Sequence, residues 1–155
     1  MKSVLFICHG NICRSPMAEF IMKDMARKAG VALRVGSAAV SYEEEGNDIY
    51  PPAKRSLSAH GIPFGRHDAH RVTDAEASEY DVIVIMDTSN KRLLSLILSP
   101  MNMSKVHMMM EYAGMALDVS DPWYTGDFEK TYRDITEGCK GLLASLMNDK
   151  SGNNL

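Results

Sequence analysis

The sequence contains few cysteines, and their number is odd. Three cysteines among 155 residues do not make a disulfide framework. Free thiols are typical of a reducing compartment, so we expect a cytoplasmic protein.

Long apolar segments and a strong excess of one charge are also absent. No stretch of about 18 apolar residues occurs, so we predict no transmembrane helix and no membrane partner. The first residues lack the apolar segment and small-residue cleavage site of a secretory signal peptide. The 17 Lys and Arg residues against 20 Asp and Glu give a net charge of −3, which argues against a nucleic-acid partner.

Repeats, low-complexity tracts and linkers are missing as well. The length of 155 residues suits one domain with a sizeable buried core. We therefore expect a single domain over residues 1–150 and a frayed tail over residues 151–155.

Short apolar runs alternate along the chain with amphipathic segments of helical periodicity. Strands are predicted over residues 4–7, 33–38, 81–87 and 105–109. Helices are predicted over residues 15–29, 51–60, from 89 onward and over 127–147. The alternation predicts an α/β fold: a three-layer sandwich with a central four-stranded parallel sheet flanked by helices. In such folds the ligand lies at the carboxyl ends of the strands.

Three residues are predicted to cap helices. Ser15 precedes Pro16, a favoured first helical residue. Thr73 stands three residues before Glu76, as in a capping box, and Ser89 precedes the next apolar helical pattern.

The segment Cys8–Ser15 connects the first strand to the first helix. Unpaired N–H groups at a helix N-terminus attract an anion, and the same field stabilises a thiolate. Arg14 offers a planar fork of donors for two phosphate oxygens, while Gly10 and Asn11 tolerate a tight backbone. The pattern predicts a phosphate cradle with a cysteine nucleophile at its base. The alternative is a buried cysteine near a surface arginine.

A thiolate that attacks phosphorus requires an acid to protonate the leaving group. Asp121 is the best candidate, because Pro122 stiffens its loop and Trp123 and Tyr124 are suited to wall a pocket for an aromatic ring. Asp-Pro is equally typical of a turn before a helix, and the pattern alone leaves both interpretations open.

The residues Val4–Glu19 resemble the signature of the low-molecular-weight protein tyrosine phosphatases. Later segments, 37–41, 60–62, 86–90 and 121–124, resemble later blocks of that family in the same order. The resemblance implies that the phosphate-binding loop (P-loop) follows the first strand. It also implies hydrolysis of protein phosphotyrosine and small aryl phosphates through a phosphocysteine, without a metal or other cofactor.

The resemblance also implies roles for individual residues. Cys8 would be the nucleophile, Arg14 would clamp the phosphate, and Asp121 would act as general acid and then as general base. The resemblance makes His67 a supporting residue for Asn11. The remaining P-loop residues would be His9, Gly10, Asn11, Ile12, Cys13 and Ser15, with Ser15 donating to the Cys8 sulfur.

The resemblance places Trp123 and Tyr124 beside the substrate ring. Where the family carries a pocket aromatic after the second strand, this chain has Tyr42 and Glu43, with Glu43 at the aligned position. Cys13 stands where the family has a second P-loop cysteine, which forms a reversible disulfide. A buried, inert thiol is the other interpretation of Cys13, because pairing requires suitable geometry.

Three other functions remain as alternatives. Arsenate reductase chemistry requires further late cysteines, and here only Cys139 is available, on the expected core face of the last helix. The phosphoarginine phosphatases carry Thr where Ile12 stands. A non-catalytic phosphate-binding module needs neither Cys8 nor Asp121.

The expected partners are a phosphotyrosine protein as substrate and inorganic phosphate as product. We expect the chain to act as a monomer or weak dimer.

Overall fold

The structure, a computed structural model, describes residues 1–152 and the side chains as far as Asn148. Its four strands are parallel and lie in the order β2-β1-β3-β4. They are β1 (Lys2–Cys8), β2 (Leu33–Ala39), β3 (Val82–Ile85) and β4 (Val106–Met108). In this register Val4 pairs with both Val35 and Val82, and Cys8 at the end of β1 pairs with Ala39. The predicted α/β fold with a central four-stranded parallel sheet is confirmed.

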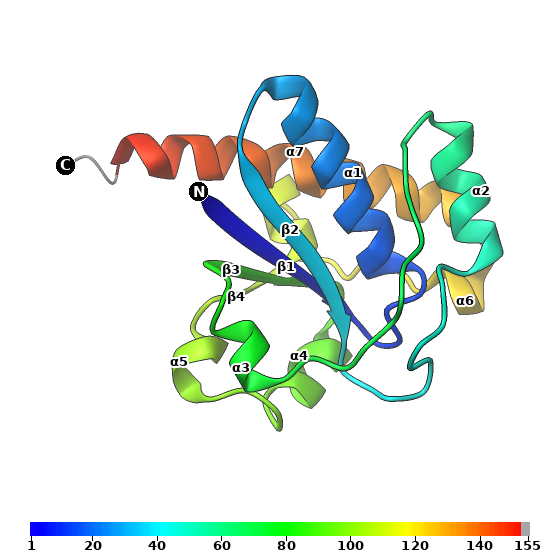
Figure 1. Cartoon of the computed structure of the whole chain (residues 1–155), viewed down its shortest axis with the longest axis horizontal. Coiled ribbons are helices and arrows are strands. Elements are labelled where there is room, and N and C mark those ends of the chain that lie inside the picture. The colour runs from blue at the N-terminus through cyan, green and yellow to red at the C-terminus, as the bar shows by residue number, and fades with distance from the viewer. Residues whose placement is uncertain (153–155) are drawn as a thin grey trace.

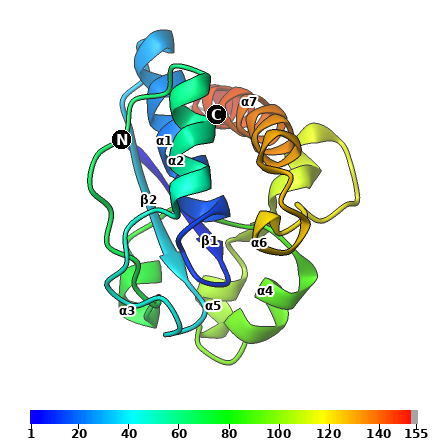
Figure 2. The same cartoon turned by 90° about the vertical axis from the view of Figure 1, so that its right-hand side faces the viewer.

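Helices cover both faces of the sheet (Figure 1). One face carries α1 (Arg14–Ala29), α2 (Pro51–Ala59) and α7 (Phe128–Gly152), with the 3-10 helix η1 (Met109–Ala113) packed against α7. The other face carries α3 (Asp74–Ala77), α4 (Thr88–Leu94) and α5 (Pro100–Met103). The short α6 (Pro122–Thr125) lies near the loop that leaves β1 (Figure 2).

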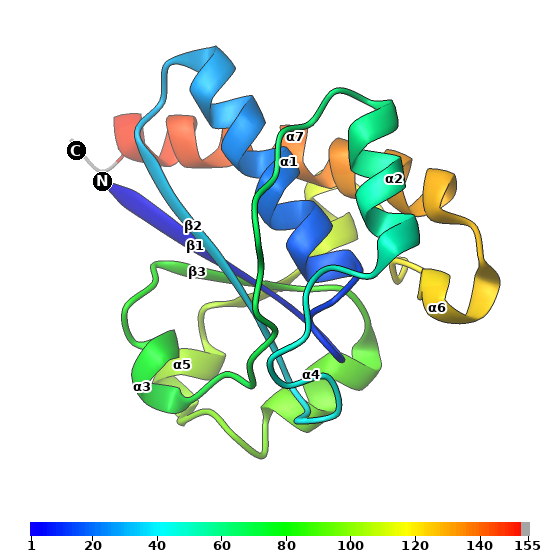
Figure 3. The same cartoon turned by 45° about the vertical axis from the view of Figure 1, so that its right-hand side comes forward.

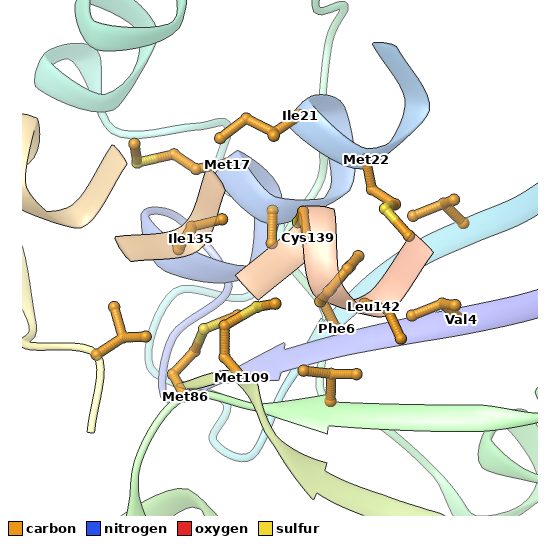
Figure 4. Close-up of a cluster of buried hydrophobic side chains, with 14 of the residues drawn as sticks. Val4, Phe6, Met17, Ile21, Met22, Met86, Met109, Ile135, Cys139 and Leu142 are labelled. Atoms are coloured by element: carbon orange, nitrogen blue, oxygen red, sulfur yellow. The ribbon is translucent and has the colours of Figure 1, made fainter. Parts of the chain in front are cut away.

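Alternate residues of β1 enter two separate cores. Val4 and Phe6 belong to the cluster beneath α1 and α7, whereas Leu5 and Ile7 belong to the cluster beneath α3 and α4. Figure 4 shows the larger cluster, in which side chains of α1 and α7 meet those of the sheet and η1. Because both faces of β1 are buried, its sequence is a continuous apolar run rather than an alternating one.

Two of the three predicted helix caps are wrong. α1 begins at Arg14 after Cys13, so Ser15 lies inside the helix, and its hydroxyl faces Cys8 instead. α4 is capped by Asp87, which accepts from Asn90 N at 2.7 Å, and Ser89 lies within the helix. Thr73 caps α3 as predicted by accepting from Glu76 N at 3.1 Å.

The last helix extends past its predicted end at Met147, as α7 continues to Gly152. The expected tail therefore begins within α7, and residues 153–155 lie outside the described residues. The N-terminus and the C-terminal end of α7 lie at the opposite end of the molecule from α6 (Figures 1 and 3). Among the described residues, no helix combines the length and apolarity needed to cross a membrane.

Candidate active site

The β1–α1 loop folds back so that backbone donors face the sulfur of Cys8. Asn11 N lies 3.3 Å and Ser15 N 3.4 Å from Cys8 Sγ. Asn11 has φ of 62°, and among the described residues it is the only non-glycine residue with a positive φ. Such a conformation is costly for most side chains and is tolerated best by Asn and Asp. The strained turn is what closes the loop around the sulfur.

A chain of side-chain hydrogen bonds orients the hydroxyl of Ser15 toward the same sulfur. Asn11 Nδ2 donates to Ser15 Oγ at 2.8 Å and to Ser37 Oγ at 3.0 Å, and Ser37 donates to Glu19 Oε1 at 2.6 Å. Ser15 Oγ accepts from Asn11, and its own proton has two acceptors in reach: Cys8 Sγ at 3.1 Å and, farther away, the carbonyl oxygen of Ala38 at 3.4 Å. Two backbone N–H groups and one hydroxyl thus converge on a single sulfur, the arrangement that a nucleophilic cysteine requires.

His67 supports the loop from the other side. Its side chain is buried, and Nε2 lies 2.7 Å from the carbonyl oxygen of Asn11. The backbone N of His67 donates to Asp48, which also accepts from Ile49 N and Lys54 Nζ. Although desolvation opposes ionisation, these three donors lower the pKa of Asp48 to about 2. His67 is therefore anchored by a carboxylate that is ionised at neutral pH.

Arg14 is almost completely buried and is fixed by oxygen atoms. Its Nη1 donates to Asp87 Oδ2 at 2.7 Å and to the carbonyl of Val119 at 2.8 Å, while Nη2 lies 3.4 Å from Asp121 Oδ2. Burial lowers the pKa of Arg14, but the neighbouring Cys8, Asp87 and Asp121 outweigh it and raise that pKa. Arg14 is thus a permanent, oriented cation.

Asp121 stands at the start of α6 and faces Arg14. Its Oδ1 accepts from Trp123 N at 3.0 Å, which leaves Oδ2 directed toward the guanidinium. The ring of Trp123 lies 4.7 Å from that of Tyr50, and Tyr50 N donates to the carbonyl of Ile12 at 2.9 Å. Tyr50 therefore connects the loop that bears Asp121 to the P-loop.

One cavity of about 130 Å³ brings most of the expected residues together. It is lined by Cys8, His9, Gly10, Ile12, Cys13, Arg14, Glu43, Glu44, Asp121, Trp123 and Tyr124. Asn11, Ser15 and His67 are buried and do not line the cavity, but Asn11 and Ser15 donate to Cys8, and His67 contacts the carbonyl of Asn11.

Of the two candidates for the wall after β2, only Glu43 lines the cavity. Its Oε2 lies 3.1 Å from His9 Nε2. Tyr42 lies outside the lining: its hydroxyl accepts from Arg71 Nη1 at 3.0 Å, and the Arg71 guanidinium lies over its ring.

Sequence reasoning missed Asp87 and Tyr50, and it left open which residues of the segment Tyr42–Glu45 line the cavity. The acidic run after β2 marked the segment that contains Glu44, and the block around Met86 and Asp87 resembled the family, but neither pattern indicated a contact. Tyr50 gave no signal beyond its place before two prolines.

The other two cysteines are buried free thiols. Desolvation raises the pKa of Cys13, and the charges of Cys8 and Asp121 raise it further. Cys139, a residue of α7, is wholly buried in the larger core, and this burial raises its pKa (Figure 4). Cys8 is therefore distinguished from both by the hydrogen-bond donors that face its sulfur.

The site combines a nucleophilic sulfur, an anion-binding loop, an oriented guanidinium and a carboxylate around one cavity. This combination defines a cysteine-dependent phosphatase class of site on an α/β scaffold. The chain also matches, over residues 3–152, the model of the family described as low molecular weight phosphotyrosine protein phosphatase. The chain belongs to this family.

Similar proteins agree with this assignment. The low molecular weight protein-tyrosine-phosphatase YfkJ of Bacillus subtilis is 37% identical over 154 residues, covering 97% of this chain and 99% of that protein. The human low molecular weight phosphotyrosine protein phosphatase is 36% identical over 152 residues, covering 92% and 94%. The crystal structure of YfkJ matches with a TM-score of 0.92 at 38% identity, covering 97% of both chains.

A structure of a drosophila arginine phosphatase is also similar. Its TM-score is 0.85 at 30% identity, covering 94% of this chain and 98% of that one. The fold is therefore shared by phosphatases of different specificity, and the substrate has to be argued from the cavity itself.

Proposed function

We propose that the protein hydrolyses protein phosphotyrosine and small aryl phosphates through a phosphocysteine on Cys8. The observation that carries this proposal is the set of donors on Cys8 Sγ: Asn11 N, Ser15 N and the Ser15 hydroxyl. A structural cysteine needs no such set, whereas a nucleophilic thiolate is stabilised by it. Arg14 and Asp121 line the same cavity.

In the first step, the Cys8 thiolate attacks phosphorus in line with the leaving phenolic oxygen. The S–P bond forms as the P–O bond breaks, and Asp121 in its acid form protonates the departing oxygen. The nonbridging oxygens lie against the loop N–H groups and Arg14. Because Nη1 of Arg14 is held by Asp87 and Val119, Nη2, with its longer contact, is the nitrogen that turns to the phosphate.

In the second step, the Asp121 carboxylate takes a proton from a water molecule. That water attacks phosphorus, the S–P bond breaks, and inorganic phosphate leaves with the thiolate regenerated. The same carboxylate therefore serves both steps, which is consistent with its place at the cavity wall beside the sulfur.

The lining favours an aryl ester. Ile12 and Trp123 give apolar surface on which a flat ring packs, and Ile12 occupies the position where the phosphoarginine branch carries Thr. We further propose that the partner is a phosphotyrosine protein in the cytoplasm, where three free cysteines stay reduced, and that the chain acts as a monomer or weak dimer.

The test is steady-state hydrolysis of p-nitrophenyl phosphate in EDTA and reductant by the wild type and Cys8→Ser. We expect turnover by the wild type and none by the variant, with circular dichroism verifying that the variant is folded. Absence of turnover by the folded wild type would contradict the proposal.

A panel of a phosphotyrosine peptide, a phosphoarginine peptide and arsenate with a thiol reductant then separates the alternatives. We expect hydrolysis of the phosphotyrosine peptide with the largest kcat/KM. A larger value for phosphoarginine, or reduction of arsenate, would reassign the function within the same fold.

A further inference from the structure

The segment 41–46 forms one side of the cavity mouth. It follows β2 and runs beside the β1–α1 loop (Figure 3), where Ser41 N donates to the carbonyl of His9 at 3.2 Å. Two carboxylates of this segment, Glu43 and Glu44, line the same cavity as Cys8. The active-site cavity therefore includes an acidic wall that the phosphoryl-transfer steps do not use.

Both carboxylates are held in place at this wall. Glu43 Oε2 lies 3.1 Å from His9 Nε2, yet 68% of the Glu43 side chain stays exposed, so the group faces the entrance. Glu44 lies across the P-loop backbone, since a Cβ added to Gly10 would stand 3.2 Å from Glu44 Cγ. Its Oε1 accepts from Asn47 Nδ2 at 3.1 Å.

The charges around the cavity are unbalanced toward the negative. Arg14, the permanent cation of the lining, is buried and faces Asp87 and Asp121. The mouth thus presents Glu43 and Glu44 to an incoming phosphate dianion. Like charges repel, and a cationic group on the substrate beside its phosphate would offset this repulsion by meeting the acidic wall.

We propose that Glu43 and Glu44 determine substrate choice by selecting phosphotyrosine segments with Lys or Arg next to the phosphotyrosine. The proposal rests on the proposed phosphotyrosine hydrolysis and adds the substrate class. His9 acts as a positioning residue that keeps Glu43 at the entrance. Acidic flanking residues are rejected by the same wall.

The test compares two phosphotyrosine peptides of equal length, one with lysines and one with glutamates on both sides of the phosphotyrosine. The ratio of their kcat/KM values measures charge selection, and effects on the shared chemistry cancel in it. We expect the wild type to favour the lysine peptide. E43Q and E44Q should each reduce the ratio by about two- to fivefold, the size of a partly exposed ion pair.

E45Q is the matched control. Glu45 belongs to the same acidic run but does not line the cavity, and its carboxylate accepts from Arg71 N. The E45Q variant should show the same ratio of kcat/KM values for the two peptides as the wild type. Added salt should reduce the wild-type ratio, because exposed charges are screened.

The outcomes separate the two proposals. Turnover of both peptides with equal kcat/KM, or a ratio unchanged in E43Q and E44Q, would overturn the charge selection alone. Absence of turnover of both peptides and of p-nitrophenyl phosphate would overturn the proposed function, and the charge selection with it.

Discussion

Asn11 links the nucleophile to three other parts of the chain. Its N–H faces Cys8, its side-chain amide donates to Ser15 and Ser37, and its side-chain oxygen accepts from His70 N. Its left-handed backbone is stabilised by these contacts, which offset a local cost of about 1–2 kcal/mol. A single side chain therefore maintains both the loop shape and the donors on the sulfur.

Asn11→Ala should destabilise the protein by about 2–4 kcal/mol, since buried partners lose hydrogen bonds and the strained φ remains. It should also lower kcat/KM by at least about tenfold, because the loop no longer holds its donors on Cys8. Urea unfolding and p-nitrophenyl phosphate kinetics measure the two effects. Asn148→Ala, at an exposed site near the end of α7, is the control and should leave both unchanged.

At the scale of single residues, the sequence predicted those site residues that a local pattern marks and not those that depend on contacts between distant parts of the chain. Cys8 and Arg14 belong to one local pattern, and Asp121 is marked by the proline that follows it. The contact of Arg14 with Asp87 joins residues 73 positions apart, and no local pattern reports it. The helix caps predicted at Ser15 and Ser89 are wrong because the Ser15 hydroxyl faces Cys8 instead, and because Asp87 caps α4 in place of Ser89.

Among the elements, α6 directly follows Asp121, the proposed general acid, but is too short to hold itself in place. It spans Pro122–Thr125, and the pair of Tyr50 and Trp123 rings attaches it to the P-loop side of the site. The ring of Tyr50 also lies 6.1 Å from that of Phe128, at the start of α7. The position of Asp121 therefore depends on a residue outside its own element.

Tyr50→Ala should lower kcat/KM for phenyl phosphate several-fold more than for 2,4-dinitrophenyl phosphate, because only the poorer leaving group depends on protonation by Asp121. Tyr132→Ala is the matched control: Tyr132 stacks on His60, and its removal should affect both substrates equally. An equal loss with both substrates for Tyr50→Ala would contradict a positioning role.

The segment between β2 and α2 is joined to the segment that carries His67 by Asp48. The pKa of Asp48 is lowered to about 2, so its ionised form stabilises the folded state. This contribution is present above the unfolded pKa of about 4 and is lost as the pH falls toward 2. Acid should therefore weaken the connection between Asp48 and His67.

Asp48→Asn should lower the free energy of unfolding by about 1–2 kcal/mol at pH 7. This value is smaller than the pKa shift alone would give, because the Asp48 side chain is partly exposed and solvent screens its charge. The difference from the wild type should shrink between about pH 4 and pH 2. Urea midpoints over this range measure it, with Asp68→Asn, at an exposed ion pair with Arg66, as the control. A difference that stays constant across the range would contradict the account.

At the scale of the whole molecule, α7 closes the larger core. Two glycines on this helix allow close contact with η1: a Cβ at Gly141 would stand 1.8 Å from the carbonyl oxygen of Tyr112, and one at Gly138 would stand 2.8 Å from that of Met109. At Gly141 the two nearest obstacles are backbone atoms, so a side-chain movement cannot relieve the clash, whereas at Gly138 the side chain of Met109 stands in the way as well.

Gly141→Ala should destabilise the protein by about 3 kcal/mol or more, because α7 has to move away from η1. Gly65→Ala, at an exposed position with open space around it, should not destabilise the protein. Thermal unfolding of both variants measures the difference. An unchanged midpoint for Gly141→Ala would contradict the close packing.

The overall architecture was accessible from sequence because its signals are long and repeated. The apolar runs of β1 and β3 and the stripe of α7 predict parallel strands under helices. Of the shorter elements, α3 and β4 were predicted, but α5 was not. α5 has four residues, and it depends on Asn102 donating to Asp74, a contact 28 positions apart. Such elements are set by tertiary contacts rather than by local propensity.

The central claim is a phosphocysteine on Cys8, and trapping it is the most direct test. Asp121→Asn with 2,4-dinitrophenyl phosphate should accumulate it, because this leaving group departs without an acid while water activation lacks its base. Rapid quench and mass spectrometry of the peptides should find one phosphoryl group on Cys8. A phosphoryl group on another residue, or release of dinitrophenol with no phosphoenzyme and no dependence on Cys8, would contradict the account.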